Sequence, residues 1–275
     1  MSRSTLLAVP LALLIRASSH AQQVPVSYTK TAQASDASTS GTSSMTPRQM
    51  AEMQGDILMA RKEYTAAAAT YCKILETEPK NAQILNKVGV SYQQLGDLHR
   101  AERYYKKSIH ADKNFASAIN NYGTVEYERK HFGRAITEYN KALQYRTDLA
   151  TIYSNLGYAY FGNKEYSLAM TTFTKALELD PTIFERKGGN GSVVQQRTAT
   201  DPGLFYFFVA KAYAQNGDAE RAAHYLKMAR DDGYADFLSA QTDATFARVI
   251  KDPRVQEVLQ VPPSYAGPVK KQVQN

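Results

Sequence analysis

Cysteine and tryptophan are nearly missing from this chain of 275 residues, which has one Cys and no Trp. The single cysteine, Cys72, cannot form an internal disulfide, so stability has to come from packing. Cys72 lies in an alanine-rich segment that predicts a helix, and a buried, inert thiol is a simpler interpretation than a nucleophile. The net charge of +7 is spread along the chain without a long run of Lys or Arg, which argues against a nucleic-acid-binding track.

An apolar run of ten residues lies near the start of the sequence. Arg3 precedes the apolar run Leu6 to Ile15, and small residues occupy the -3 and -1 positions of a cleavage site at Ser19 to Ala21. The run is too short to span a bilayer. We therefore predict that residues 1–21 are a signal peptide, with an uncleaved membrane anchor as the alternative. The prediction implies export to a periplasm or the extracellular space, without a stable membrane span once the signal is removed.

Polar, low-complexity stretches flank and interrupt the sequence that follows the predicted signal peptide. Residues 22–47 are rich in Ser, Thr and Gln and predict a disordered spacer, because they offer too little apolar surface to offset chain entropy. Residues 182–202 contain "GGNG" and predict an inserted loop, which either carries function or is a tolerated insertion. Residues 263–275 predict a flexible tail.

The 19 Tyr and 10 Phe, by contrast, are abundant, and many of them recur with small residues at a period of 34. We number each unit from position 1, at Arg48, Ala82, Ala116 and Ala150. Position 8 is then always Gly, position 20 always Ala, and position 24 always aromatic: Gly55, Gly89, Gly123 and Gly157; Ala67, Ala101, Ala135 and Ala169; Tyr71, Tyr105, Tyr139 and Phe173. A fifth unit begins near Gly203, with Ala210 at position 8 and Leu226 at position 24.

These offsets predict two helices per unit. Apolar positions 4, 7, 8 and 11 share one face of a first helix, and positions 20, 24 and 27 share one face of a second. Small residues at positions 8 and 20 allow the two helices to cross closely, and the aromatic residue at position 24 is expected to fill the gap toward the next pair. Pro79 and Pro181 end second helices because proline lacks a backbone donor.

The pattern resembles the tetratricopeptide repeat (TPR) family, whose unit is a helix-turn-helix of this length and spacing. The resemblance implies an all-α fold, a right-handed superhelical solenoid of about five units. We assign residues 48–181 to units 1 to 4 and residues 203–234 to unit 5. Residues 235–262 are expected to form C-terminal capping helices, with Asp252 capping the last one ahead of Pro253.

The resemblance also implies a groove lined by the first helices, where positions 2, 5, 6, 9, 12 and 13 face inward. Amides and aromatic rings gather at these positions and suit a bound peptide, because an amide both donates and accepts and a ring offers flat apolar area. An alternative is that the amides merely suit the fold and the rings plug the groove. The candidate peptide-binding residues are Asn86, Lys87, Asn120, Asn121, Tyr127, Ser154, Asn155, Tyr158 and Phe161. Lys87 and Lys211 are too few for the carboxylate clamp found in some family members.

No arrangement of residues predicts catalysis, a cofactor or a metal. The histidines fall on different units, and "GGNG" lacks the strand and the Lys-Ser/Thr of a phosphate loop. The sequence therefore favours a non-catalytic protein-interaction scaffold that is exported and binds peptides or proteins, with cell-envelope assembly and self-association as candidate roles. The alternative is an enzyme or enzyme accessory that acts on envelope polysaccharide through a tyrosine-lined groove.

Overall fold

The structure, a computed structural model, describes residues 45–185 and 201–260. The predicted signal peptide, most of the spacer, most of the inserted loop and the C-terminal tail lie outside these residues. The described residues form helices and turns, without a strand among them. The elements are α1 (Pro47–Ala60), α2 (Tyr64–Thr77), α3 (Ala82–Gln94), α4 (Leu98–Ala111), α5 (Ala116–Glu128), α6 (Phe132–Leu143), α7 (Ala150–Gly162), α8 (Tyr166–Leu179), α9 (Pro202–Gln215), α10 (Ala219–Asp231), the 3₁₀ helices η2 (Phe237–Gln241) and η3 (Ala244–Phe246), and α11 (Pro253–Leu259).

The helix starts follow from local capping chemistry. The Asn81 side chain accepts a hydrogen bond from the backbone N–H of Ile84 at the start of α3. At the start of α4, the Asp97 side chain accepts from the backbone N–H of Arg100. Such oxygens satisfy N–H groups that the first helical turn leaves without an intrahelical partner. Thr46 and Gln49 form a reciprocal capping box at the start of α1.

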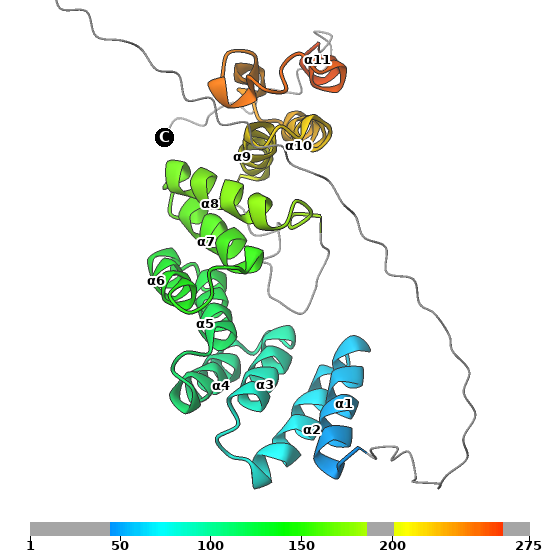
Figure 1. Cartoon of the computed structure of the whole chain (residues 1–275), viewed down its shortest axis with the longest axis vertical. Helices are drawn as coiled ribbons and strands as arrows, with labels where there is room; N and C mark the ends of the chain where they lie inside the picture. Colours follow the sequence, from blue (N-terminus) through cyan, green and yellow to red (C-terminus); the bar gives the residue numbers. More distant parts are fainter. Residues whose placement is uncertain (1–44, 186–200, 261–275) are drawn as a thin grey trace, which may run out of the picture. The chain divides into compact units, whose positions relative to one another are not determined.

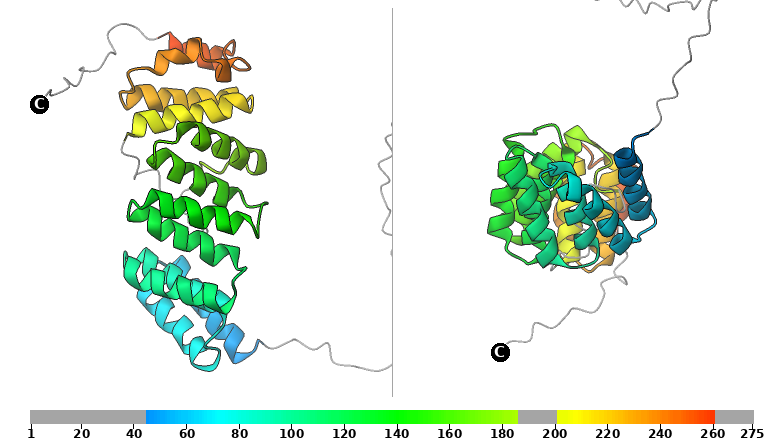
Figure 2. Two further views of the ribbon diagram at one scale, coloured as in Figure 1. Left: turned by 90° about the vertical axis from the view of Figure 1, so that its left-hand side faces the viewer. Right: turned by 90° about the horizontal axis from the view of Figure 1, so that it is seen from below.

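The helices pack as consecutive antiparallel pairs, and each pair packs on the next. α1 pairs with α2, α3 with α4, α5 with α6, α7 with α8 and α9 with α10. The second helix of each pair also contacts the first helix of the following pair, so that the pairs follow one another in chain order (Figures 1 and 2). This is the consecutive packing of an all-α TPR solenoid, as the 34-residue period predicts.

Within a pair, the glycine at position 8 makes room for the ring at position 24. A Cβ built on Gly123 would lie 2.8 Å from Cε1 of Tyr139, which is closer than real contacts allow. The small residue is therefore needed, as predicted. The ring, however, lies across the glycine of its own unit, whereas we expected it to fill the gap toward the next pair. In unit 5 both partners change together, to Ala210 and Leu226, and both are buried.

The turn between the two helices of a pair has the same backbone form in every unit. Position 15 has a positive φ in each one, at Lys62, Gly96, Lys130, Lys164 and Gly217. In unit 3 the N–H of Lys130 donates to the carbonyl of Tyr127, and the N–H of His131 donates to that of Glu126. These bonds satisfy carbonyls at the end of the first helix, and only the left-handed residue allows both to form.

The end of the chain covers the last pair. The predicted cap exists, but before α11 it consists of the 3₁₀ helices η2 and η3 rather than an α-helix. Asp252 caps α11, as predicted, by accepting from the N–H of Arg254. Phe246 and Val255 are buried beneath this segment, which packs on α9 and α10. Within the described ranges, none of the helices combines the length and the apolar character needed to cross a bilayer.

Candidate functional site

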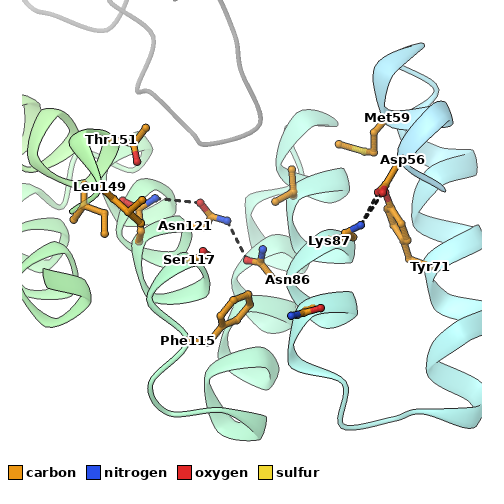
Figure 3. A pocket seen from close by; sticks show the side chains of 14 residues that line it. Asp56, Met59, Tyr71, Asn86, Lys87, Phe115, Ser117, Asn121, Leu149 and Thr151 are labelled. Carbon is orange, nitrogen blue, oxygen red and sulfur yellow. Dashed lines mark hydrogen bonds and ion pairs between the residues drawn. The ribbon is translucent and has the colours of Figure 1, made fainter. Parts of the chain in front are cut away.

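The first helices of units 1 to 4 contribute to one pocket with a volume of about 450 Å³. We call it the inner-face pocket (Figure 3). It is lined by Asp56, Met59, Tyr71, Gln83, Asn86, Lys87, Val90, Phe115, Ser117, Asn120, Asn121, Leu149, Thr151 and Ile152. Because α1, α3, α5 and α7 each begin a unit, the 34-residue period brings residues of the same unit position side by side along this face.

One end of the pocket is charged. The Nζ of Lys87 donates to both carboxylate oxygens of Asp56, at 2.7 and 2.9 Å, and lies 2.8 Å from Oε1 of Glu52. Tyr71 donates from its hydroxyl to Asp56 at 2.6 Å. Figure 3 shows Lys87 and Tyr71 converging on Asp56. The pocket's one lysine is therefore bound to two carboxylates instead of standing ready for an incoming anion.

The pKa values of this cluster follow from burial and hydrogen bonding. Burial opposes the charged form of Lys87, but its hydrogen bonds to Asp56 and Glu52 outweigh that effect and raise its pKa. Burial, supported by the hydrogen bond to Asp56, also raises the pKa of the Tyr71 hydroxyl well above its ordinary value. Lys87 is charged and Tyr71 is neutral throughout the physiological range, so the cluster keeps its pattern of charge there.

The predicted ladder of amides is present, and its members bond to one another. Asn155 on α7 donates to Asn120 on α5 at 3.1 Å, Asn120 donates to its neighbour Asn121 at 3.2 Å, and Asn121 donates to Asn86 on α3 at 3.0 Å. The chain of amides thus joins three units and ends at Asn86. Within the described part of the chain, the side-chain nitrogen of Asn86 has no acceptor, and it lines the pocket.

The nine predicted site residues separate into two groups. Asn86, Lys87, Asn120 and Asn121 line the inner-face pocket together. Asn86 and Lys87 are half-buried, whereas Asn120 and Asn121 are buried. The other five do not line it and are buried elsewhere: Tyr127, Ser154, Asn155, Tyr158 and Phe161.

The three predicted aromatic residues are therefore not exposed along the groove, which corrects the expectation from unit positions 9 and 12. Tyr158 stacks on Phe205 of α9, with ring centroids 5.0 Å apart, and Phe161 meets the same ring edge-on at 5.6 Å. Tyr127 packs against Phe132 at 5.3 Å. The run "LFYFF" in α9 supplies the rings that cover this part of the inner face.

Of the other residues that line the pocket, some were predicted and others were missed. Position 2 was expected to face the groove, and Gln83, Ser117 and Thr151, which occupy it, all line the pocket. Phe115 and Leu149 were missed. They occupy position 34, in the connection between units, where a helical period gives no orientation. The sequence signal that could have identified them is the position in the repeat that they share.

The second lysine considered for a carboxylate clamp is also paired. The Nζ of Lys211 lies 2.8 Å from Oδ2 of Asp243. Among the described residues, no three His, Cys, Asp or Glu side chains form a group that could hold a metal ion. The pocket offers apolar side chains, hydroxyls, the side-chain amides of Gln83 and Asn86 and a paired carboxylate to a bound molecule.

Sequence models of one family match three segments of the chain. The models described as tetratricopeptide repeat match residues 82–115 and 150–183, and one described as TPR repeat matches residues 123–164. Comparison with curated proteins finds no matching sequence.

Solved structures with a similar fold include PilF of Pseudomonas aeruginosa. It is 21% identical, with 79% of this chain and 88% of that chain covered and a TM-score of 0.51. MamA of Desulfovibrio magneticus RS-1 is 17% identical over 68% of this chain and 96% of its own, with a TM-score of 0.48. YrrB, described as a TPR protein with an unusual peptide-binding site, is 17% identical over 70% of this chain and 91% of its own, with a TM-score of 0.44.

Proposed function

We propose that this chain, which belongs to the tetratricopeptide repeat family, is a non-catalytic scaffold that binds a segment of a partner protein in the inner-face pocket. One observation carries the proposal. A single pocket extends along the first helices of four units and is lined by side chains that include a free amide donor. Stacked helix pairs use such a face for binding because each unit adds the same kind of contact.

The pocket favours a particular kind of segment. Asn86 offers its side-chain N–H groups to a backbone carbonyl, and the hydroxyls of Ser117 and Thr151 offer further hydrogen bonds. Met59 and Val90 provide apolar surface for a side chain of the segment. We expect an uncharged or basic segment with one apolar anchor.

An acidic C-terminus is disfavoured, because a carboxylate entering the pocket would meet a lysine already held by Glu52 and Asp56. The side chain of Asp56 is more than half exposed. It would repel the carboxylate and attract a lysine or arginine of the segment.

Binding is tested best with an exposed lining residue, since alanine at buried Asn121, Asn155 or Phe161 would also damage the fold. Ser117→Arg places a long side chain in the pocket from the solvent side. Its matched control is Ser167→Arg, at an exposed serine on the second helix α8, away from the pocket. The probes are peptides selected by the wild-type chain from a random extended library. We expect S117R to lose these peptides while S167R retains them, with unchanged helical circular dichroism in both.

Equal binding by S117R and S167R would rule out the pocket as the binding surface. The alternative partner, an envelope polysaccharide, loses the exposed rings on which it depended, since Tyr127, Tyr158 and Phe161 are buried. A glycan array probed with the same two variants distinguishes the alternatives. Glycan binding that S117R abolishes, without any selected peptide, would favour the polysaccharide.

Export is a second part of the proposal, and the composition of residues 1–21 supports it. The scaffold then acts in a periplasm or outside the cell, in assembly of the envelope. A fusion of residues 1–47 to a phosphatase that is active only after export tests this part. We expect phosphatase activity and, by N-terminal sequencing, a mature chain that begins at Gln22. An inactive fusion, with the chain retained inside the cell, would contradict it.

A further inference from the structure

One side of α1 carries a stripe of exposed apolar side chains. Met50, Met53 and Ile57 are 47%, 46% and 37% exposed, and their spacing of three and four residues places them on one side of the helix. The residues that α1 contributes to the inner-face pocket, Asp56 and Met59, point elsewhere. The three apolar residues are called the α1 stripe below.

The unit positions of Met50 and Ile57 are buried in every later unit, whereas position 6, which Met53 occupies, holds half-buried residues in units 2 and 5. Met50 and Ile57 occupy positions 3 and 10 of unit 1. Their counterparts are at most 1% exposed: Ile84 and Ser91, Ala118 and Val125, Ile152 and Ala159, Phe205 and Ala212. The reason is that α2, α4, α6 and α8 each pack on the first helix of the following unit. Met50 and Ile57 thus occupy this same interface one unit earlier, and in the described part of the chain no helix covers the α1 stripe.

The opposite end of the stack is closed. The cap containing η2, η3 and α11 packs on α9 and α10 and buries Phe246 and Val255. A second copy therefore finds no open helix at that end on which to stack head to tail. The uncovered apolar face occurs at the N-terminal end of the described repeats, so two copies cover both of these faces at once when they place these ends together.

We propose that the α1 stripe is the contact of a two-fold dimer of this chain, in which α1 packs antiparallel on α1 of the second copy. Antiparallel pairing places Met50 of one copy against Ile57 of the other, with Met53 beside the symmetry axis. Methionine suits such a contact because its flexible thioether adapts to an opposing surface. The interface is isologous, so it closes at two copies and does not extend into a filament.

Gln54 favours a second copy of α1 as the occupant of the α1 stripe. It disfavours a helix that would pack on α1 in the way that α2 packs on α3. It occupies position 7, where Val88, Leu156 and Val209 are buried in other units, whereas Gln54 is exposed. A helix packed in the internal manner would cover that amide without a partner, at a cost in free energy. A two-fold contact centred on the α1 stripe leaves Gln49 and Gln54 at a polar rim.

The size of the surface sets the expected strength. α1 has 14 residues, so it is about 21 Å long, and one helix face covers less than the ~800 Å² per partner of a standard interface. We therefore expect a weak dimer that dissociates on dilution. The inference does not depend on the proposed function, because the α1 stripe and the inner-face pocket share no residue.

Sedimentation equilibrium of the purified chain over a wide concentration range tests the dimer. We expect reversible dimerisation in the wild-type chain and a monomer at every concentration for Met50→Glu combined with Ile57→Glu. The control is Leu168→Glu combined with Leu238→Glu, which changes leucines that are 46% and 45% exposed on other elements. The control is expected to dimerise as the wild type does. A wild-type monomer throughout, or equal dimerisation by both double variants, would overturn the proposal.

A cysteine at the axis tests the geometry independently. In a Cys72→Ser background, Met53→Cys is expected to form a disulfide-linked dimer on mild oxidation, because the two copies of residue 53 meet at the axis. Leu168→Cys in the same background is expected to remain monomeric. Equal cross-linking at both positions, or none at residue 53, would contradict the antiparallel arrangement. In that case a helix of another protein becomes the candidate occupant of the α1 stripe.

Discussion

The ring of Tyr105 lies directly over Gly89, so that a Cβ at Gly89 would come within 2.6 Å of its Cε1 atom. The same pairing of a position-8 glycine with a position-24 ring occurs in units 1, 3 and 4. Because the two residues belong to the two helices of one pair, this contact fixes how closely the helices approach.

We predict that Gly89→Ala lowers the free energy of unfolding by about 1–3 kcal/mol, since an added methyl group forces the ring or the helices to move. Gly133→Ala is the matched control. Gly133 lies within α6, and no atom outside its own helical surroundings comes within 4 Å of an added Cβ, so alanine there is expected to raise stability by about 0.5–1 kcal/mol. Urea denaturation measures both. A neutral Gly89→Ala would show that the close approach is not required.

A smaller residue at position 24 should rescue the overpacked helix pair. Gly157→Ala combined with Phe173→Leu reproduces the pairing found in unit 5, where Ala210 faces the position of Leu226. We expect the double variant to be more stable than the sum of the two single changes predicts, by about 0.5–3 kcal/mol of coupling. Phe173 has no hydroxyl, so no hydrogen bond is lost in the cycle. Additive single effects would contradict direct contact.

The left-handed turn residue offers a stabilising substitution. Lys130 has a φ of 62°, a region in which side chains other than glycine cost about 1–2 kcal/mol. We predict that Lys130→Gly raises the melting temperature, with the gain reduced by the greater freedom of glycine in the unfolded chain. The reciprocal control, Gly96→Ala at a φ of 76°, is expected to lower it. Thermal unfolding followed by circular dichroism measures both, and opposite signs are the required result.

The Tyr158 hydroxyl is buried without a hydrogen-bond partner in the described part of the chain. Burial also raises the pKa of this phenol well above its ordinary value, so it stays neutral. We predict that Tyr158→Phe raises the free energy of unfolding by about 1–3 kcal/mol, because an unsatisfied hydroxyl is removed and the ring is kept.

Tyr139→Phe is the control for that change. Its hydroxyl donates to Oγ1 of Thr124 at 3.2 Å, so phenylalanine there is expected to lower stability by about 0.5–1.5 kcal/mol. A loss of stability in Tyr158→Phe would show that its hydroxyl does have a partner.

Glu128 should make stability depend on pH. Glu128 is exposed as a residue, but desolvation of its carboxyl group raises the pKa, and the hydrogen bond from Gln93, 2.7 Å long, offsets this only in part. The folded chain thus binds the proton more tightly than the unfolded chain, so stability is lost as pH rises from the ordinary carboxyl pKa through the raised one.

We predict that Glu128→Gln is more stable than the wild type at pH 7, and that this advantage disappears in acid. Melting temperatures measured across this range test it. Glu76→Gln, at an exposed carboxylate on α2, serves as the control and is expected to show no such trend. A Glu128→Gln curve parallel to the wild-type curve would contradict the prediction.

The sequence alone determined the repeating frame, because the contact behind it is local. Gly89 and Tyr105 are 16 positions apart and meet within one helix pair, so their sizes must match wherever the pair occurs. Capping by Asp252 and the break at Pro181 are equally local. Helix order, the 34-residue period and the all-α fold therefore followed from residue types and spacing.

Only the tertiary structure decided which residues each unit leaves exposed, because that depends on the neighbouring units. Asn155 and Asn86 hold related positions, yet Asn155 is buried and Asn86 ends the amide chain in the pocket. Tyr158 is buried because the rings of α9 reach it, beyond an insertion that hides the period. Met50 and Ile84 share one unit position, and α2 covers only Ile84. A repeat pattern describes what all units have in common, whereas the binding surfaces arise where the units differ in what lies against them.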